Sequence, residues 1–355
     1  MRSKNPSWLW RLAILAAPFS AVSCSTPRGG EVGPRYFWQA ALGQMELFNR
    51  AQSIQTALAH PRLKPRYRKE LESVSYIRDF IRRAGLEATQ SYQEFVDLER
   101  ESVVWVVSAC KPLQFEAQSW SFPIVGSFTY LGWFNPEDAQ EMQSRLEQEG
   151  FDADVRGAAA YSTLGWFRDP VISTLLGAGP GALAETLIHE SVHSTLHLKN
   201  QSTLNESMAQ FVAEKLTPLY LEEQGGEKSR KEYEGTLLQA HSRKTRLRRA
   251  YHELQSIYGS GAPDSEKLKL KQSRLESLRA ELSWPQKRTL NNATLIQFAT
   301  YESGGEGFEA IWRACGGKLT RFLKVIRDAE STLARVQDSG LEEALRHLAH
   351  SCGAQ

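Results

Sequence analysis

A chain of 355 residues, of which 41% are hydrophobic and 10% aromatic, can bury a sizeable core, which excludes an intrinsically disordered protein. The formal net charge of +2 includes three basic and no acidic residues within residues 1–23. Without that segment the net charge is 2 − 3 = −1. Composition therefore gives little support to nucleic-acid binding, and we expect no nucleic-acid partner.

The amino terminus has the features of a targeting segment. Basic residues precede an apolar run at 12–22 that is too short to remain in a bilayer as a spanning helix. The run leads into Ala21-Val22-Ser23-Cys24, which resembles a bacterial lipobox, so we expect Cys24 to carry a lipid anchor that attaches the protein to a membrane. By the same resemblance Ser25 favours the outer membrane, facing the periplasm of a Gram-negative bacterium. An ordinary cleaved signal peptide with an incidental cysteine is the alternative.

Three cysteines follow Cys24, namely Cys110, Cys315 and Cys352. In an oxidising compartment an odd number allows at most one disulfide within the chain. The pairing stays open, with Cys315 and Cys352 favoured because both lie in the last helical segment. Cysteine ligation of zinc is not expected, since the chain has no C-x-x-C spacing.

Two helices are expected first, because apolar residues recur at helical spacing over residues 36–59 and 63–84. In the first helix these residues are Phe37, Ala41, Met45, Phe48, Ile54 and Leu58. A β-branched run at 103–107 then predicts a buried strand. Asn135 and Pro136 predict the cap and first turn of a helix that reaches about residue 149. Further strands are expected at 122–125, 128–134 and 154–160.

The most informative run is Thr186–His193, which contains the pattern H-E-x-x-H. Residues four apart share one face of a helix, so His189 and His193 can direct their imidazoles at one point, with Glu190 beside it. A catalytic zinc ion needs two such nitrogens, a third protein ligand and an open position for water. Glu206 is the candidate third ligand, on a second helix packed against the first. A surface helix that happens to carry histidines is the alternative, and the apolar flanks disfavour it.

These residue types suit hydrolysis of a carbonyl compound. Zinc lowers the pKa of its bound water and polarises the carbonyl, and Glu190 is placed to accept the proton as general base. His197 lies two helical turns from His189, too far to share one tetrahedral ion, and we expect it to be structural or a partner of a ligand. Glu214, eight residues after Glu206, could be a partner of a ligand or merely exposed, and we favour exposure.

Several segments around this motif resemble one known family. They are Ser91-Tyr92, Val103-Val104-Trp105, residues 160–167 with Asp169-Pro170, His189-Glu190-x-x-His193 and Asn205-Glu206-Ser207-x-Ala209. They resemble the bacterial zinc aminopeptidase family of predicted lipoproteins over roughly residues 36–220. The His-Glu-His plus Asn-Glu pattern is also that of gluzincin metallopeptidases.

The resemblance implies a peptide substrate, zinc ligation by His189, His193 and Glu206, and Glu190 as the base. Gluzincins often stabilise the oxyanion with a Tyr or His beyond the third ligand, which makes Tyr301 a catalytic candidate, although a buried structural Tyr is the commoner case. Two features depart from the gluzincin pattern: the gap before Glu206 is short, and no Gly-x-Met-Glu-Asn motif is present. "Metallopeptidase" is therefore better supported than "aminopeptidase".

By analogy with zincins, the strand before the metal helix is expected to bind substrate backbone by strand addition. This places the substrate near residues 157–164, with Tyr161 and Trp166 at the rim of the site, unless these aromatic rings belong to the core. The glycine-rich loop at 176–181 is not followed by Lys-Ser/Thr, so we do not expect it to bind phosphate.

Residues 222–289 change character, because Lys and Arg become dense and leucines repeat at spacings of three, four or seven residues. The pattern predicts a helical hairpin of coiled-coil type. Its basic run at 243–249 is expected to be a solvated face, with lipid headgroups or an anionic envelope partner as the alternative. Amphipathic helices are expected from residue 290 to residue 352.

Together these patterns predict an α+β, predominantly α-helical fold with a zincin-like core. The expected units are a signal peptide at 1–23, a flexible tether at 24–35, a catalytic domain at 36–221, the hairpin at 222–289 and a helical region at 290–355. The expected function is zinc-dependent peptide-bond hydrolysis at the cell envelope. A zinc endopeptidase and a non-catalytic envelope lipoprotein with a structural or vestigial metal site are the alternatives; the oligomeric state and the physiological substrate are not predicted.

Overall fold

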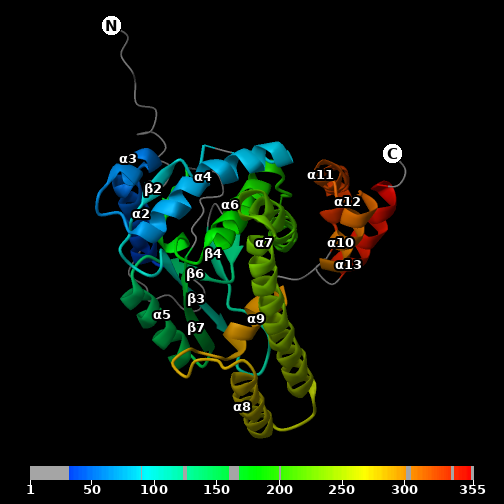
Figure 1. Cartoon of the computed structure of the whole chain (residues 1–355). Helices are drawn as coiled ribbons and strands as arrows, with labels where there is room; N and C mark the ends of the chain where they lie inside the picture. The colour runs from blue at the N-terminus through cyan, green and yellow to red at the C-terminus, as the bar shows by residue number, and fades with distance from the viewer. Residues whose placement is uncertain are drawn as a thin grey trace.

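A computed structural model describes residues 32–88, 90–122, 126–159, 168–199, 201–300, 305–336 and 340–352. Helices dominate and small β-sheets accompany them (Figure 1), which confirms the predicted α+β, predominantly helical class. Four predicted functional residues, Cys24, Tyr161, Trp166 and Tyr301, lie outside the described residues. Among the described helices, none combines the length and the apolar character that crossing a membrane requires.

The single helix expected over residues 36–59 is two helices. Helix α2 (Pro34–Arg50) ends at an extended residue, and the short strand β1 (Gln52–Ser53) follows. Helix α3 (Ile54–Ala59) comes next, and the Ser53 side chain caps its start by accepting a hydrogen bond from the Thr56 amide. The expected apolar pattern does not line one buried face, because Ile54 is buried whereas Met45 and Phe48 are exposed.

Helix α4 (Pro65–Ala84) agrees closely with the second prediction. It ends at Gly85, whose φ of 90° is the left-handed conformation that glycine tolerates best. The helix buries the apolar row that its spacing implied: Leu71, Val74, Ile77, Phe80 and Ile81.

The main sheet has the order β6-β3-β7. The central strand β3 (Val104–Cys110) pairs antiparallel with β6 (Leu131–Trp133) and with β7 (Asp152–Ala158). Helix α5 (Pro136–Gln148) packs on β3 and β7, and the Asn135 side chain caps it as expected. A second sheet has the order β1-β2-β8, and β4 pairs with β5. These strands are β2 (Glu94–Val96), β8 (Val171–Ile172), β4 (Trp120–Phe122) and β5 (Gly126–Phe128).

The largest core cluster joins α4 to α6 (Pro180–Thr195) and to the first part of α7 (Ser202–Gly259). The chain turns back at Gly226, whose φ is 68°, so α7 consists of two helical segments. Two pairs across this turn, Glu214 with His241 and Glu222 with Arg230, show that the segments run side by side. The second segment then pairs with α8 (Asp264–Glu281). The region predicted as one hairpin therefore contains a second reversal at its start.

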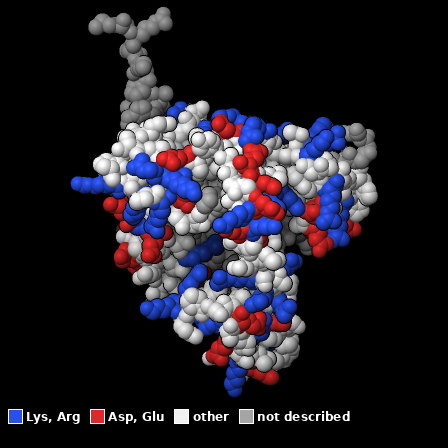
Figure 2. All heavy atoms as spheres, in the orientation of Figure 1, with Lys and Arg blue, Asp and Glu red and all other residues white. Residues whose placement is uncertain are grey.

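Part of the expected basic face of this hairpin is engaged in packing. Arg243 and Arg288 lie over the Trp284 ring, with 4.7 Å and 4.8 Å to its centroid, and Arg246 donates to the Glu281 carbonyl. Acidic and basic side chains are interspersed over most of the face seen in Figure 2, as the small net charge of +2 implies.

The carboxy-terminal part is helical, as expected. It contains α9 (Asn292–Thr300), α10 (Gly305–Ala314), α11 (Leu319–Asp328), α12 (Glu330–Leu333), α13 (Leu341–Leu348) and the 3₁₀ turn η3 (Ala349–Cys352). It joins the main core through Phe211, whose ring stacks on Phe322 at 5.6 Å. Cys315 is disulfide-bonded, whereas Cys110 is a free buried thiol whose pKa burial raises to about 12.

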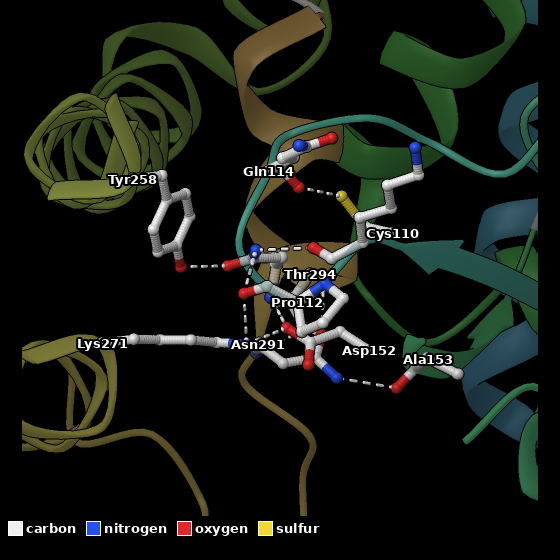
Figure 3. A network of polar contacts seen from close by, with 11 residues as sticks. Cys110, Pro112, Gln114, Asp152, Ala153, Tyr258, Lys271, Asn291 and Thr294 are labelled. Carbon is white, nitrogen blue, oxygen red and sulfur yellow. Dashed lines mark hydrogen bonds and ion pairs between the residues drawn. The ribbon is translucent and has the colours of Figure 1, made fainter. Parts of the chain in front are cut away.

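A buried polar network fixes the hairpin to the main sheet (Figure 3). The Lys271 ammonium on α8 lies 2.5 Å from the Asp152 carboxylate at the start of β7, and it donates to the Pro112 carbonyl at 3.0 Å. Asp152 also accepts from the Asn292 amide at 2.9 Å, and Tyr258 donates to the Asn292 side chain at 2.8 Å. This network thus joins strand β7 to helices α7, α8 and α9 around one buried ion pair.

Replacing Lys271 with Met should destabilise the protein strongly, because Lys271 is only 7% exposed and its loss leaves the Asp152 charge buried without its cation. We expect the free energy of unfolding to fall by about 3–5 kcal/mol in urea denaturation. Lys269→Met on the same helix is the matched control, since Lys269 is exposed, and its effect should stay within about 0.5 kcal/mol. Equal effects of the two substitutions would contradict the structural role of the network.

Candidate metal centre

Helix α6 separates an apolar face from a polar one. Its buried face consists of Leu183, Ala184, Leu187, Ile188 and Val192, each 0% exposed. This spacing leaves His189, Glu190 and His193 on the part of the helix that faces away from the core. Burial of one face therefore fixes the rotation of the helix and, with it, the direction of the three functional side chains.

The start of α6 is held by an internal carboxylate. The amides of Gly177 and Gly179 donate to the two carboxylate oxygens of Glu70, at 2.7 Å and 3.1 Å, and Glu70 is only 7% exposed. Both glycines have a φ of 98°, which a residue with a side chain would adopt only under strain. This loop, which the sequence did not favour as a phosphate site, thus binds a carboxylate of the protein itself.

A short turn between α6 and α7 places the third ligand. Asn205 is 2% exposed, and its side chain accepts from the Leu198 amide at 2.9 Å and donates to the Leu198 carbonyl at 2.8 Å. This pair of bonds closes the turn onto the first turn of α7 and fixes the position of Glu206, the next residue. The short gap before Glu206, noted above as a departure from the gluzincin pattern, is accommodated in this way.

Three predicted ligands converge. The Nε2 atoms of His189 and His193 lie 3.2 Å apart. Glu206 places one carboxylate oxygen 3.3 Å from His189 Nε2 and the other 3.4 Å from His193 Nε2. Nitrogen and oxygen ligands at about 2.0–2.2 Å around a tetrahedral zinc ion are separated by about 3.3–3.6 Å. The donor set and its spacing therefore fit a zinc ion, and the two imidazoles and one carboxylate leave a fourth position for water.

The site is partly buried, with its carboxylate the most accessible member. The side chains of His193, His189 and Glu206 are 9%, 18% and 35% exposed. Burial acts to raise the pKa of Glu206, but hydrogen bonds from His189 and His193 and the charges of these imidazoles outweigh it, so the pKa of the carboxyl is lowered. Glu206 is therefore ionised at neutral pH, as a metal ligand must be.

A second layer of polar residues lies on the same two helices, one turn from the ligands. Glu185 comes four residues before His189, and Gln210 comes four residues after Glu206, so each shares a face with a ligand. Gln210 Nε2 donates to Glu185 at 2.8 Å and to Glu214 at 2.7 Å. Two carboxylates are thus bridged by one amide beside the ligands.

The second segment of α7 completes this layer. The Tyr233 hydroxyl donates to Glu185 at 2.9 Å, and His241 Nε2 lies 3.1 Å from a Glu214 oxygen. A Cβ atom on Gly181 would lie 2.7 Å from the Tyr233 ring, so only glycine permits this approach. The expectation that Glu214 is exposed was wrong: its side chain is 18% exposed and hydrogen-bonded.

Tyr92 lies near Glu190 in a strained backbone conformation. Its φ of 61° is unusual for a bulky residue, and its amide donates to the Asp169 carbonyl at 2.6 Å. The Asp169 amide in turn donates to the Ser91 hydroxyl at 3.2 Å. Burial, and then the charges of Glu190 and Asp169, raise the pKa of Tyr92 well above its usual value, so the phenol keeps its proton.

The sequence did not assign roles to Tyr92, Glu185 or Gln210. Ser91-Tyr92 and Asp169 were available only as parts of a resemblance, and no local pattern indicates that they pair. The helical spacing of Glu185 from His189 was a usable signal, because a charged residue one turn before a ligand shares its face. Tyr233 carried no such signal, since it reaches Glu185 only because the chain reverses at Gly226.

One comparison with known proteins identifies a family. The chain matches the model of a family described as "Putative aminopeptidase" from residue 35 to residue 341. The chain belongs to this family. No curated protein and no solved structure matches it. Membership of an aminopeptidase family supports peptidase activity and a peptide substrate, and the match includes the metal centre, both segments of α7 and α8.

Replacing Glu206 with Ala should remove zinc, because it deletes one of three converging ligands. The zinc content is measured by inductively coupled plasma mass spectrometry after dialysis. We expect about one zinc per chain in the wild type, and an affinity for zinc that is lower by at least about tenfold in the variant. Glu214→Ala is the matched control on the same face of α7, and it should retain zinc. Retention by Glu206→Ala, or loss from Glu214→Ala alone, would exclude the ligand set.

Proposed function

We propose that this member of the aminopeptidase family is a zinc-dependent aminopeptidase of the bacterial cell envelope. The observation that carries the proposal is the convergence of His189, His193 and Glu206 with ligand atoms within 4.8 Å of one another, beside Glu190. A purely structural zinc site normally closes with a fourth protein ligand. The group of potential ligands found among the described residues has three members, which favours a catalytic site.

His189, His193 and Glu206 would hold the zinc ion. When bound in such a site, zinc supplies a water of lowered pKa and polarises the scissile carbonyl. Glu190 follows His189 directly on α6, and its half-buried side chain has no hydrogen-bond partner among the described residues. Its carboxylate is therefore available to accept the proton of the attacking water and to pass it to the amine that leaves when the C–N bond breaks.

The layer around Glu185 supports recognition of a free amino terminus. An aminopeptidase must bind the α-ammonium group of its substrate close to the metal, and the chain lacks the Gly-x-Met-Glu-Asn motif that does so elsewhere. The Glu185 carboxylate lies one turn from His189 on α6, the Glu214 carboxylate lies two turns from Glu206 on α7, and Gln210 joins them. A carboxylate can accept more hydrogen bonds than the two that each of these receives, so both keep capacity for an ammonium group.

Strand β7 supports binding of an extended peptide. Within the described part of the chain it pairs only with β3, so it is an edge strand. The Ala153 carbonyl accepts from the Asn291 side chain and thus points away from β3. Because backbone groups alternate along an antiparallel strand, Val155 and Gly157 also direct theirs away from β3. These groups are suited to hydrogen-bond a substrate backbone by strand addition.

The envelope location rests on the amino-terminal sequence. The apolar run at 12–22 followed by Ala-Val-Ser-Cys24 is the basis for a lipid anchor, and Ser25 is the basis for the outer membrane. A diacylated amino-terminal cysteine supplies enough buried methylene groups for stable attachment.

Replacing Glu190 with Gln should abolish hydrolysis but leave the metal in place, because the amide keeps the size of the side chain and cannot accept the proton. With an unblocked peptide we expect kcat to fall by at least about a hundredfold, the usual weight of a general base. Release of the first residue is measured by mass spectrometry, and zinc content is measured on the same sample. Wild-type rates in Glu190→Gln would show that the mechanism is wrong.

The same peptide with an acetylated amino terminus is the control for exopeptidase action. The wild type should cleave the unblocked peptide and leave the acetylated one intact, since acetylation removes the ammonium charge. Cleavage of both at equal rates would identify an endopeptidase instead.

A further inference from the structure

Helix α2 exposes apolar side chains on its outer face. Trp38, Leu42 and Met45 are 69%, 48% and 49% exposed, and Phe48, at 40%, continues the row. Their spacings of four, three and three residues place them on one stripe along the helix. Single exposed apolar residues are common, but a continuous stripe of large ones marks an interaction surface.

The opposite face of α2 is fixed to the protein. Leu47 is 1% exposed, and a Cβ atom on Gly43 would collide with the Phe134 ring at 2.1 Å, so the helix lies close against this ring. The Gln39 side chain donates to the Gly132 carbonyl at 3.2 Å and accepts from the Phe134 amide at 2.9 Å. These contacts hold α2 in place beside β6, so the outer stripe is presented by a rigid element.

The charges on α2 are paired within the protein, so the helix carries little net charge that would oppose contact with a lipid surface. The helix has a single acidic residue, Glu46, which is paired with Arg50 and Arg100. Arg35 and Arg50 lie at the two ends of the helix, where Arg35 pairs with Asp138 and Glu141 and Arg50 also lies 3.7 Å from Glu99. A tryptophan within an apolar stripe bordered by arginines is typical of helices that lie in the membrane interface.

The position of α2 in the chain selects a membrane over a second copy of the protein. Nine residues separate Cys24 from Pro34, and they span at most about 30 Å when fully extended. An anchor at Cys24 therefore keeps α2 within reach of the bilayer surface. One helix face is also a small surface for a stable dimer, which buries about 800 Å² on each partner.

We propose that α2 is an interfacial helix that lies in the plane of the bilayer surface and inserts Trp38, Leu42 and Met45 at the boundary between headgroups and acyl chains. Together with the anchor it attaches the protein at two points and sets the orientation of the peptidase unit relative to the membrane. The inference rests on the proposed anchor at Cys24 and is independent of the metal centre.

Spin labelling of the full chain tests the proposal. A nitroxide is attached to Leu42→Cys or, as the matched control, to Leu238→Cys, which replaces another exposed leucine, 72% exposed, on the hairpin. The chain without an added cysteine is the blank, and the buried thiol of Cys110 should not react. Each protein is reconstituted on vesicles of phosphatidylethanolamine and phosphatidylglycerol, and the accessibility of the label to oxygen and to a water-soluble nickel chelate is measured.

The label at position 42 should be about tenfold less accessible to the chelate than the label at position 238, and more accessible to oxygen, because the inserted face lies about 5–10 Å below the surface. Equal accessibility at both positions would overturn the proposal and leave the anchor intact. Spin–spin broadening that disappears on dilution with unlabelled protein would identify a second copy as the occupant, and protection from both reagents would identify a protein segment. Failure of the protein to bind vesicles would remove both the anchor and this inference, without bearing on peptide hydrolysis.

Discussion

The packing of α6 against the first segment of α7 is the constraint on which the rest of the site depends. Burial of Leu187, Ile188 and Val192 sets the rotation of α6 and so directs its two histidines toward α7. The Asn205 side chain closes the intervening turn, which sets the register of α7 and places Glu206 opposite them. A shift of α7 by a single residue would rotate the carboxylate by about 100° and remove it from the site. The ligand set is thus a consequence of core packing together with one buried amide.

The same two helices continue the polar arrangement beyond the ligands. Glu185 and Gln210 repeat the contact between α6 and α7 one turn away, and Tyr233 reaches them from the returning segment. The hairpin that follows is tied to the start of β7 by the buried pair Lys271–Asp152 (Figure 3). The hairpin, which in sequence resembles a separate coiled coil, therefore positions two parts of the proposed site. One is the edge strand β7, proposed to bind the substrate backbone. The other is the layer around Glu185, proposed to bind the substrate's amino terminus.

Much of this was predictable from local patterns, and the remainder depended on tertiary contacts. His189, Glu190 and His193 share a motif with helical spacing, so periodicity predicts that they lie on one face, whereas the position of Glu206 opposite them depends on the packing of a second helix. The partial burial of Glu214 is not visible in the sequence, because only the reversal at Gly226 brings its partner His241 beside it. The helix expected over residues 36–59 is interrupted at β1, and this break comes from the pairing of β1 with β2, which local periodicity does not show. Helical spacing also cannot distinguish a stripe that faces the core from one that faces outward, as Met45 illustrates.

X-ray absorption spectroscopy at the zinc edge of the wild-type protein tests the central claim most directly, because it identifies the ligand atoms without an assay of activity. The account predicts a first shell of nitrogen and oxygen only, at about 2.0–2.2 Å, with the imidazole scattering of two histidines. A sulfur shell at about 2.3 Å, or the absence of an ordered zinc shell in metal-replete protein, would contradict it.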